Sequence, residues 1–530
     1  MGNKTNLLLI SLLAAISLSY FRCFIYDTKV YPLVPNPRSG QVNSPTKAHL
    51  NDGSVIIFKD GFGVGIDQIN GSGELYNIDR QFVRTVDGVA LDSVAFMEQY
   101  RLEVEPNSAL GGVLGPAIFG LGLTNERIKK AIFGSCPTIY ACDGENYSLQ
   151  AECFSYSICA MAENADLDRI DRGQALNSEY RIKITNEALE THYINLMQLL
   201  YVDHKMAVEA FPTDDQDIVL LGPENLIEDA RDKNGLEIMD RIGERDNIWY
   251  QSDSSTLTHL TSEVIEDWIE LRIRKPAAAS RIVLAFRLRN TLFNTVFFYD
   301  VMLRSAGLRS LDWMAGRDMN PLYAWQFNNW YRDHFGLKIQ IRDGREFETV
   351  HWVGDCGPIA WRQCAVNLDV PGEEYVRIRL AFLPDNWMID WVSAGIPEKE
   401  APVVYQADCQ RLTKIGTEPV EIEPAKIAGA DDAYFVTYPA ESYQALFHVS
   451  EEKPELRRTY FLKSQGYYIE WIRREWFRAV DLDAQNVGYS LNDDTIVRTA
   501  RLWQAKKHTF EKEFFSSRIS GSGRVMHETH

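Results

Sequence analysis

Short strand-like runs separated by turn residues recur through most of this chain. Ser54–Lys59 leads into Asp60-Gly61, and Val83–Thr85 leads into Asp87-Gly88. Further along, Trp268–Ile273 alternates apolar and polar residues. Turn residues about every ten positions are typical of all-β domains, and 530 residues suffice for about three or four domains. We therefore expect a mainly β, multidomain protein.

The runs divide the chain into a small N-terminal β domain, β-sandwich domains of the jelly-roll kind with a helical insertion, and a helical C-terminal tail. The insertion is predicted from apolar residues at helical spacing between Thr291 and Phe335. The expected parts are a signal peptide or membrane anchor (1–22), a tether (23–46), a small β domain (47–105), an apolar and helical connector (106–134), a β domain (135–263), a jelly-roll-like β-sandwich (264–396) with a helical insertion (291–335), a β domain (397–475) and a helical and disordered tail (476–530).

The first residues predict export. Leu7–Phe21 is uncharged and almost wholly apolar, and as a helix it would span about 22 Å, less than the ~30 Å hydrocarbon core. This length suits a signal peptide, and Ser17 and Ser19 offer small residues for cleavage. Two alternatives are an uncleaved membrane anchor and lipidation at Cys23, which the large residues Tyr20-Phe21-Arg22 disfavour. The expected location is the bacterial cell envelope, in the periplasm or on the outer surface.

The chain has eight cysteines and no C-x-x-C pair, so the usual zinc spacing is absent. In an exported protein these cysteines can form disulfides. A hairpin with Gly144-Glu145 at its tip would place Cys136 opposite Cys153, at roughly disulfide distance. Cys356 and Cys364 flank a Gly-Pro pair and would close a second short hairpin. The alternative is that all four are free, buried thiols.

The charge balance is acidic, with 74 Asp and Glu against 55 Lys and Arg and a net charge of −19. A nucleic-acid-binding surface needs clustered Lys and Arg, so we expect no nucleic-acid partner. The sequence has no G-x-S-x-G, no H-E-x-x-H and no Walker loop. We therefore expect no cofactor, and no motif identifies a catalytic residue.

Tryptophans close to carboxylates form the first candidate site, because exposed aromatic rings and hydrogen-bonding groups together bind sugars. The candidate ligand-binding residues are Trp352, Asp355, Trp361, Asp385, Trp387, Asp390 and Trp391. Trp387 and Trp391 have even spacing on one predicted strand and share a face. A shared face is also what a hydrophobic core requires, so core packing is the alternative.

Acids and histidines between two strand-like runs form the second candidate site. The residues are Glu187, Glu190, His192, Asp203 and His204. Together they could hold a divalent metal or perform acid–base chemistry. They could equally be solvated groups of turns and strand edges.

Two motifs resemble a known family. Cys136–Tyr140 (CPTIY) is followed by Asp143–Tyr147 (DGENY), and Ile184–Glu187 (ITNE) by Glu190–Tyr193 (ETHY). Over most of residues 50–475, the chain resembles a family of uncharacterised exported bacterial β-rich proteins. The resemblance implies export and a β-rich fold, and it carries no catalytic residue.

Residues 264–396 are also similar to a galactose-binding-like jelly roll. The similarity lies in the order of strand runs, in Asp343-Gly344 as a hairpin turn and in the run Trp387–Val392. It implies a β-sandwich, and such sandwiches bind sugars or proteins. This is an analogy of fold.

These features predict a non-enzymatic, exported cell-envelope protein that presents β-sandwich surfaces to a glycan or protein partner. One alternative is an envelope polysaccharide hydrolase that uses a carboxylate pair, either Asp385 and Asp390 or Glu187 and Glu190. Another is a structural subunit of an envelope assembly, with Ala109–Leu123 as its contact. The ligand, the partner and the oligomeric state stay open.

Overall fold

The computed structural model describes residues 26–33, 40–44, 46–50, 55–76, 82–104, 136–144, 146–157, 163–188, 190–253, 256–257, 260–261, 265–303, 321–416, 418–431, 434–437, 441–470 and 493–517. The chain forms two compact units, Met1–Asn125 and Glu126–His530. The predicted signal peptide, Cys23, the apolar segment Ala109–Leu123 and the tail beyond Ser517 lie outside the described residues.

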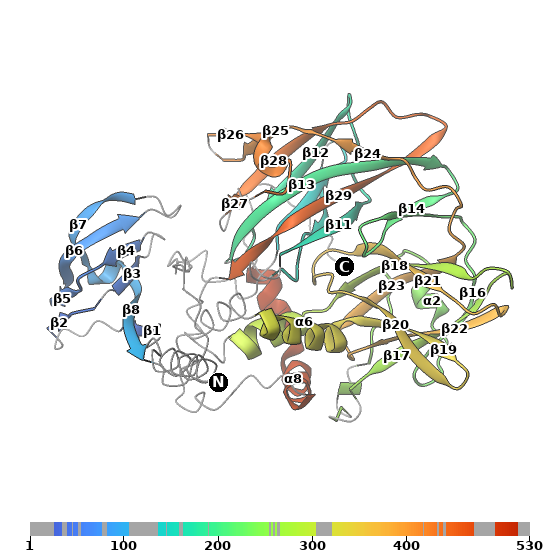
Figure 1. Ribbon diagram of the computed structural model, residues 1–530, viewed down its shortest axis with the longest axis horizontal. Helices are drawn as coiled ribbons and strands as arrows, with labels where there is room; N and C mark the ends of the chain where they lie inside the picture. The colour runs from blue at the N-terminus through green and yellow to red at the C-terminus, as the bar shows by residue number, and fades with distance from the viewer. Residues whose placement is uncertain are drawn as a thin grey trace, which may run out of the picture. The chain divides into compact units, whose positions relative to one another are not determined.

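An antiparallel sheet forms the first unit. Its order is β1 (Tyr26–Leu33), β8 (Val94–Val104), β3 (Thr46–Leu50), β4 (Val55–Phe58), β6 (Gln68–Tyr76), β5 (Phe62–Val64) and β2 (Gln41–Val42), with β7 (Phe82–Ala90) on β6 and the 3-10 helix η1 (Leu91–Ser93) before β8. The predicted small β domain is confirmed, but it begins earlier than residue 47. Because β1 pairs with β8 along its whole length, part of the predicted tether is an edge strand (Figure 1).

The first unit buries one face of its sheet around Phe58, Phe62 and Ile69. The predicted Asp60-Gly61 turn precedes β5, and Gly61 there has φ +83°. A Cβ atom at Gly61 would lie 1.8 Å from the carbonyl oxygen of Val42. Glycine is therefore required at this close approach.

Two facing sheets form the first sandwich of the second unit. One sheet has the order β10 (Tyr147–Glu152), β9 (Thr138–Cys142), β12 (Glu179–Thr185), β28 (Ser442–His448), β25 (Cys409–Lys414) and β26 (Val420–Ile422). The other has the order β11 (Asn164–Ile170), β29 (Leu456–Glu470), β13 (Glu190–Lys205) and β24 (Val404–Ala407), with β27 (Phe435–Thr437) on β13. The rings of Tyr180 on β12 and Tyr460 on β29 lie 4.3 Å apart, so the sheets pack face to face.

This sandwich is built from two distant segments of the chain. The strands β13 and β29 pair from Glu190 opposite Glu470 to Lys205 opposite Leu456, and they run side by side in Figure 1. Strands β12 and β28 pair in the same way. Residues 135–263 and 397–475, expected as separate domains, therefore share one sandwich, and the second sandwich is inserted between them.

The second sandwich confirms the β-sandwich expected within residues 264–396. Its five-stranded sheet has the order β16 (Ile227–Asp232), β17 (Asp267–Arg274), β22 (Tyr375–Phe382), β19 (Leu337–Asp343) and β20 (Glu346–Val353). Its three-stranded sheet has the order β21 (Arg362–Asp369), β18 (Arg281–Asn290) and β23 (Trp387–Gly395). Because β16 supplies an edge strand, the sandwich begins before residue 264.

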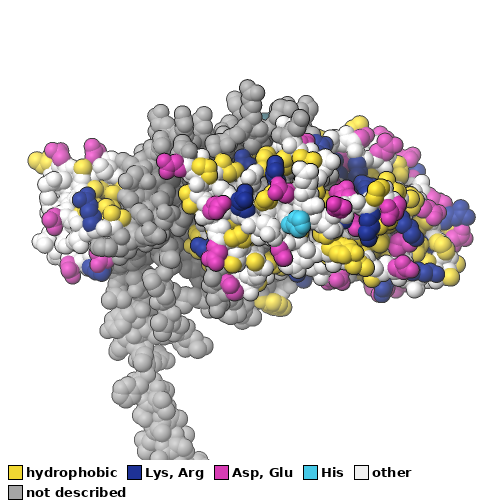
Figure 2. Space-filling model, turned by 90° about the horizontal axis from the view of Figure 1, so that it is seen from above, with side chains coloured by type: hydrophobic (Ala, Val, Ile, Leu, Met, Phe, Trp, Pro, Cys, Tyr) yellow, Lys and Arg dark blue, Asp and Glu magenta, His cyan; other side chains and the backbone are white. Residues whose placement is uncertain are grey.

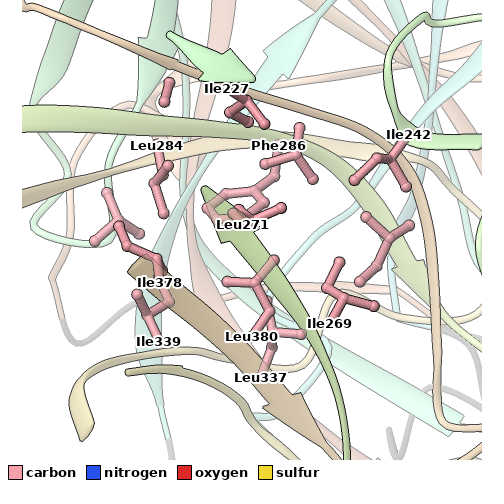
Figure 3. Packing of buried hydrophobic residues seen from close by; sticks show 14 of the residues in the cluster. Ile227, Ile242, Ile269, Leu271, Leu284, Phe286, Leu337, Ile339, Ile378 and Leu380 are labelled. Carbon is pink, nitrogen blue, oxygen red and sulfur yellow. The ribbon is translucent and has the colours of Figure 1, made fainter. Parts of the chain in front are cut away.

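The core of the second sandwich follows from strand alternation. On β17, Ile269, Leu271 and Ile273 are fully buried while the residues between them reach the surface. Leu284 and Phe286 come from β18 in the facing sheet, and Figure 3 shows these side chains pointing between the two sheets. Period-two burial of this kind is what a half-buried strand produces.

A hairpin joins the two sandwiches. It consists of β14 (Glu209–Pro212) and β15 (Ile218–Leu221). Phe211 and Leu221 pack on Val283 and Ala285, which lie on the outer face of β18. Both faces of β18 are therefore buried, and this accounts for its almost continuous apolar run.

Helices cover one end of the second unit. The predicted insertion contains α3 (Phe293–Thr295), the π-helix η4 (Val296–Leu303) and α6 (Pro321–Phe335), and the predicted C-terminal helix is α8 (Asp493–Ser517). The short helices α2 (Met239–Ile242) and η6 (Pro424–Ile427) complete the described elements. On α8, one face buries Ile496, Ala500, Trp503 and Phe510, and the helix contacts η4.

The predicted Cys136–Cys153 disulfide is wrong, since both residues are free thiols. The hairpin begins in the expected register, with Cys142 opposite Tyr147. A bulge at Gln150 then shifts the pairing by one residue, so the N–H of Cys153 donates to the carbonyl of Pro137 at 3.1 Å. Burial raises the pKa of both thiols.

The predicted Cys356–Cys364 disulfide is also wrong, because these two cysteines are free. Strands β20 and β21, on either side of Cys356, belong to different sheets and do not pair. The connection between them crosses from one sheet to the other, so it forms no hairpin for a disulfide to close.

The described surface mixes charges of both signs. In Figure 2, Lys and Arg lie among Asp and Glu over the face in view. Among the described residues, no helix is both long and apolar enough to cross a membrane.

Candidate ligand-binding site

A cavity of about 500 Å³ lies where the two sandwiches of the second unit meet. The first sandwich lines it with residues around the end of β10 and the start of β11, and the second with the connection between β20 and β21 and with helix α6. Its aromatic residues are Tyr156, Phe298, Phe327, Tyr331 and Tyr468, and its charged residues are Glu152, Glu163, Asp166, Asp214, Asp355, Arg332 and Arg362.

Glu152 fastens the two sandwiches together beside the cavity. Its Oε2 accepts the N–H groups of Ile359 at 2.6 Å and Ala360 at 2.9 Å. The connection between β20 and β21 passes beside the Glu152 carboxylate at Gly357, which has φ +77°. A Cβ atom at Gly357 would lie 2.7 Å from Oε2 of Glu152, so the close approach requires glycine.

Asp355 is the sequence-predicted ligand residue that lines the cavity. Its Oδ2 accepts hydrogen bonds from Asn294 Nδ2 at 2.6 Å and the Tyr331 hydroxyl at 2.8 Å, and its Oδ1 accepts the N–H of Gly357 at 2.9 Å. Burial raises the pKa of Asp355, although these three donors act in the opposite direction. The carboxyl is therefore held rigidly in the wall.

Arg362 joins the sandwiches through buried ion pairs. Its Nη2 lies 2.7 Å from Oδ1 of Asp166, and its Nε lies 3.8 Å from Oδ1 of Asp168. Asp166 and Asp168 have even spacing on β11, so they share one strand face. Burial, and then the charge of Asp166, raise the pKa of Asp168 well above its ordinary value, while Arg362 lowers it.

Replacing Asp168 with asparagine should stabilise the second unit, and the gain should grow with rising pH across the range above about pH 4, the ordinary pKa of an aspartate. Burial keeps the Asp168 carboxyl protonated in the folded protein at a pH where the same carboxyl ionises in the unfolded protein. The folded state is therefore most stable below the pKa that Asp168 has in the unfolded protein, and it loses stability as the pH rises from there through the pKa in the folded protein. Asparagine removes that loss. Urea unfolding of both proteins across this range measures the difference, and a gain that is constant or falls with pH would contradict the assignment.

Helix α6 supplies two of the aromatic residues of the wall, Phe327 and Tyr331. The rings of Phe327 and Tyr331 stack at 5.9 Å, and Tyr331 stacks on Phe335 at 4.8 Å. Across the cavity, the hydroxyl of Tyr468 donates to the carbonyl of Ser155 at 2.9 Å. Tyr156 is partly exposed, and its ring lines the same space.

The four predicted tryptophans do not line this cavity. Trp387 is fully buried in the core, and its Nε1 donates to the carbonyl of Phe335 at 3.0 Å. The other three carry arginine side chains over their rings. Arg332 lies 4.5 Å from the ring of Trp352, Arg287 and Arg289 each lie 4.8 Å from that of Trp361, and Arg245 lies 3.7 Å from that of Trp391. These contacts fix the rings within the protein.

Asp385 and Asp390 lie outside the cavity wall and make separate contacts. The carboxylate of Asp385 accepts hydrogen bonds from Trp503 Nε1 at 2.7 Å and from Lys507 Nζ at 2.9 Å, and the backbone of Asp385 has φ +60°. Asp385 therefore anchors helix α8. Asp390 sits at a bulge in β23 and pairs with Arg287. The two carboxylates therefore do not converge on one open cleft.

The five predicted metal ligands divide between the two ends of β13. Near its start, the buried Glu190 and His192 pair at 3.0 Å, and Glu187 accepts the hydroxyl of Tyr140 at 2.7 Å. Asp203 pairs with Arg458, and His204 lies 2.8 Å from the hydroxyl of Thr459. At ~3.3 Å per residue the two ends are about 40 Å apart.

This separation contradicts a metal site shared by all five residues. In the part of the chain that the structure describes, no group of three or more His, Cys, Asp or Glu is placed to hold a metal ion. Glu187 and Glu190, the other predicted carboxylate pair, are buried and do not line the cavity.

Sequence reasoning missed most of the cavity wall, including Tyr156, Asp166, Tyr331 and Arg362. Asp166 and Asp168 stand on a strand that buries its last five residues, Arg169 among them. Two acids at buried positions of a strand indicate a partner cation elsewhere in the fold. That signal is visible in the sequence, but the partner Arg362 is almost two hundred residues away.

No family model matches this sequence, and no curated protein matches it. Among solved structures, a glycoside hydrolase family 31 α-xylosidase (Xac1773) from Xanthomonas citri is similar, with 9% identity and a TM-score of 0.13. That alignment covers 82% of this chain, which spans 38% of the α-xylosidase chain. A similarity of this size carries no argument about function.

Proposed function

We propose that the protein binds a saccharide unit in the cavity between its two sandwiches and does so without catalysing a reaction. The observation that carries the proposal is a wall in which aromatic rings alternate with fixed hydrogen-bonding groups. Aromatic faces pack on the C–H faces of sugars, and polar groups bind the hydroxyls. A volume of about 500 Å³ also suits a small ligand.

Three carboxylates of the wall already accept hydrogen bonds from the protein. Glu163 accepts them from Asn195 at 3.1 Å, Gln465 at 3.0 Å and the Tyr434 hydroxyl at 2.6 Å. Glu152 and Asp355 are held in the same manner. General acid–base catalysis needs a carboxyl that reaches the substrate. Because these three carboxylates are already hydrogen-bonded to the protein, the wall favours a binding function over catalysis.

A hydrolase is the second candidate, and one observation favours it. Asp355 has a pKa raised by burial, which a general acid requires, and Asp166 is a second carboxyl in the same wall. This pair replaces the two carboxylate pairs that the sequence suggested. Release of a shorter sugar during the binding experiment below would favour this candidate.

The proposed setting is the bacterial cell envelope, to which the apolar run Leu7–Phe21 would direct the chain. A glycan-binding protein there would hold a polysaccharide of the envelope or its surroundings. A protein partner and an assembly role through Ala109–Leu123 remain as rival proposals. A screen of purified full-length protein on an array of bacterial and host glycans separates a glycan ligand from these two.

Replacing Tyr156 with alanine should weaken binding of a glycan from this screen at least about tenfold, because it removes an aromatic face from the wall. Tyr156→Phe should bind almost normally, since the hydroxyl makes only a 3.5 Å contact with the Ala165 carbonyl. Titration calorimetry measures both affinities. Tyr375→Ala, on the exposed face of β22, is the matched control. Equal affinity of Tyr156→Ala and the unaltered protein would place the ligand elsewhere.

A further inference from the structure

We infer that the outer face of the five-stranded sheet in the second sandwich binds an acidic polysaccharide. The basis is a set of three arginines on neighbouring strands, Arg272 on β17, Arg377 on β22 and Arg342 on β19, which we call the arginine row. None of the three lines the cavity, so this site does not depend on the proposed function. The structure describes every residue of the five strands, so the charges on their outer face can be compared in full.

Strand pairing brings the three arginines together. Arg272 lies directly opposite Arg377. Strands β22 and β19 pair up to Ile378 opposite Ile341, and the next position in this register places Arg377 opposite Arg342. Neighbouring strands lie about 4.8 Å apart, so the arginine row spans about 10 Å across the sheet.

The arginine row costs the sheet stability. Like charges at directly opposed positions destabilise a pair of strands, and the side chains of Arg272 and Arg377 are only 49% and 51% exposed. On its other side Arg272 faces Asp229, but the carboxylate of Asp229 pairs with Arg231 at 2.9 Å. A local arrangement that works against stability is typical of a functional site, and an anion bound across the row would relieve the repulsion.

Positive charge is in excess on this face, although the whole chain has a net charge of −19. The outward cations of the strands are Arg231, Arg272, Arg274, Lys338, Arg342, Arg377 and Arg379. The outward acids are Glu228, Asp229 and Glu270, and the flanking acids Glu266 and Glu374 pair with Lys338 and Arg274. Seven cations therefore face five acids, and Arg345 and Glu346 at the adjoining turn balance each other.

The acids of the face compensate the arginine row only in part. Nη2 of Arg272 lies 3.8 Å from Glu228, a carboxylate that is shared with a second arginine. Nη1 of Arg377 lies 3.0 Å from Glu270, which is also shared. Nε of Arg342 donates to a backbone carbonyl at 3.1 Å, and this arginine has no ion pair among the described residues. All three guanidinium groups can therefore pair with a carboxylate of a ligand.

An open groove of about 660 Å³ on the same face favours a saccharide as the anion. Its wall includes Arg342 of the row together with Gln340 and Arg345, and these side chains offer N–H donors to the hydroxyl and ring oxygens of a sugar. A long nucleic acid is disfavoured, because the row is short and the acidic remainder of the chain would repel phosphates beyond it.

The test compares four ligands with the full-length protein by titration calorimetry. They are an oligogalacturonate, its methyl ester, which keeps the sugars but removes the charges, poly-glutamate and single-stranded DNA. The oligogalacturonate should bind at least about tenfold tighter than each of the others, and its affinity should fall between about 20 mM and about 300 mM salt. Equal binding of the methyl ester, or equal or tighter binding of poly-glutamate or DNA, would overturn the assignment of an acidic saccharide.

The double variant Arg272→Gln and Arg377→Gln tests the position of the site, because it removes two charges and keeps N–H donors. It should weaken binding of the oligogalacturonate at least about tenfold. Arg281→Gln is the matched control, since Arg281 is an exposed arginine that pairs with Asp369 on the other sheet; it should bind normally. The melting temperature of Arg272→Gln should not fall, because the change removes a directly opposed like charge. A fall would make Arg272 a structural residue.

Tyr156→Ala separates this site from the cavity. It should bind the oligogalacturonate normally, since Tyr156 lines the cavity and lies outside the sheet face. Unchanged affinity in the double arginine variant, or a loss confined to Tyr156→Ala, would overturn the arginine row as a binding site and leave the proposed function standing. Failure of the unaltered protein to bind the oligogalacturonate would overturn the inference in the same way.

Discussion

Replacing Arg362 with alanine is expected to lower the free energy of unfolding of the second unit by about 3–5 kcal/mol. Arg362 is buried between the sandwiches and pairs with Asp166 at 2.7 Å. Without it, the carboxylate of Asp166 would remain buried without its partner, beside Asp168 on the same strand face. Removing one partner of a buried ion pair is costly because the other charge stays desolvated.

Tryptophan fluorescence during urea unfolding measures this loss in the second unit alone, because all twelve tryptophans follow residue 248. The control is Arg377→Ala, whose side chain is 51% exposed and pairs with Glu270; that change should cost less than about 1 kcal/mol. In an Asp166→Asn and Asp168→Asn background, Arg362→Ala should cost less than it does alone. A loss for Arg362→Ala no larger than the control's would contradict the role assigned to this buried pair.

Replacing Trp503 with alanine is expected to cost about 3–5 kcal/mol and to release helix α8. Trp503 is fully buried, its ring lies 5.9 Å from Phe293, and its Nε1 donates to Asp385 at 2.7 Å. The change leaves a cavity and removes one donor from a buried carboxylate. The remaining contacts of α8, including Lys507 with Asp385, do not replace this packing.

Limited trypsin digestion provides the second measurement, since α8 carries Arg498, Arg501 and Lys506 on its exposed side. Release of the helix should expose these sites to cleavage before the rest of the unit unfolds. Trp325→Ala serves as the matched control because Trp325 is 64% exposed on α6, and it should change stability by less than about 0.5 kcal/mol. Unchanged digestion of Trp503→Ala would show that α8 stays docked without the indole ring.

Asp355 is the part of the candidate site that could be predicted from the sequence. Its closeness to tryptophans in the chain predicts a role in ligand binding, yet in the fold it contacts Asn294 and Tyr331. The same reasoning predicts Trp387 and Asp385 as ligand residues, and these two serve the core and the docking of α8. Aromatic and acidic residues that are close in the sequence can suggest the chemistry of a site. The wall of a cavity between two sandwiches, however, is formed by residues that are far apart in the chain.

Local bulges also changed what sequence patterns predicted. A regular hairpin places Cys136 opposite Cys153, but the side chain of Gln150 accepts the N–H groups of Asp171 and Arg172 at 2.9 Å. The accompanying bulge shifts the strand by one residue. A shift of one residue turns every later side chain to the other face of the sheet. No short-range pattern in the sequence predicts the bulge at Gln150.

The amino-acid sequence by itself determined the kind of secondary structure. Period-two burial on β17 and a helical apolar face on α8 are local consequences of side-chain order, so they can be read along the chain. The tertiary structure alone decided that residues 135–263 and 397–475 share one sandwich and that Arg362 meets Asp166 across the junction. Strand pairing and buried ion pairs depend on groups that folding brings together over long separations, and these separations leave no periodic signal in the sequence.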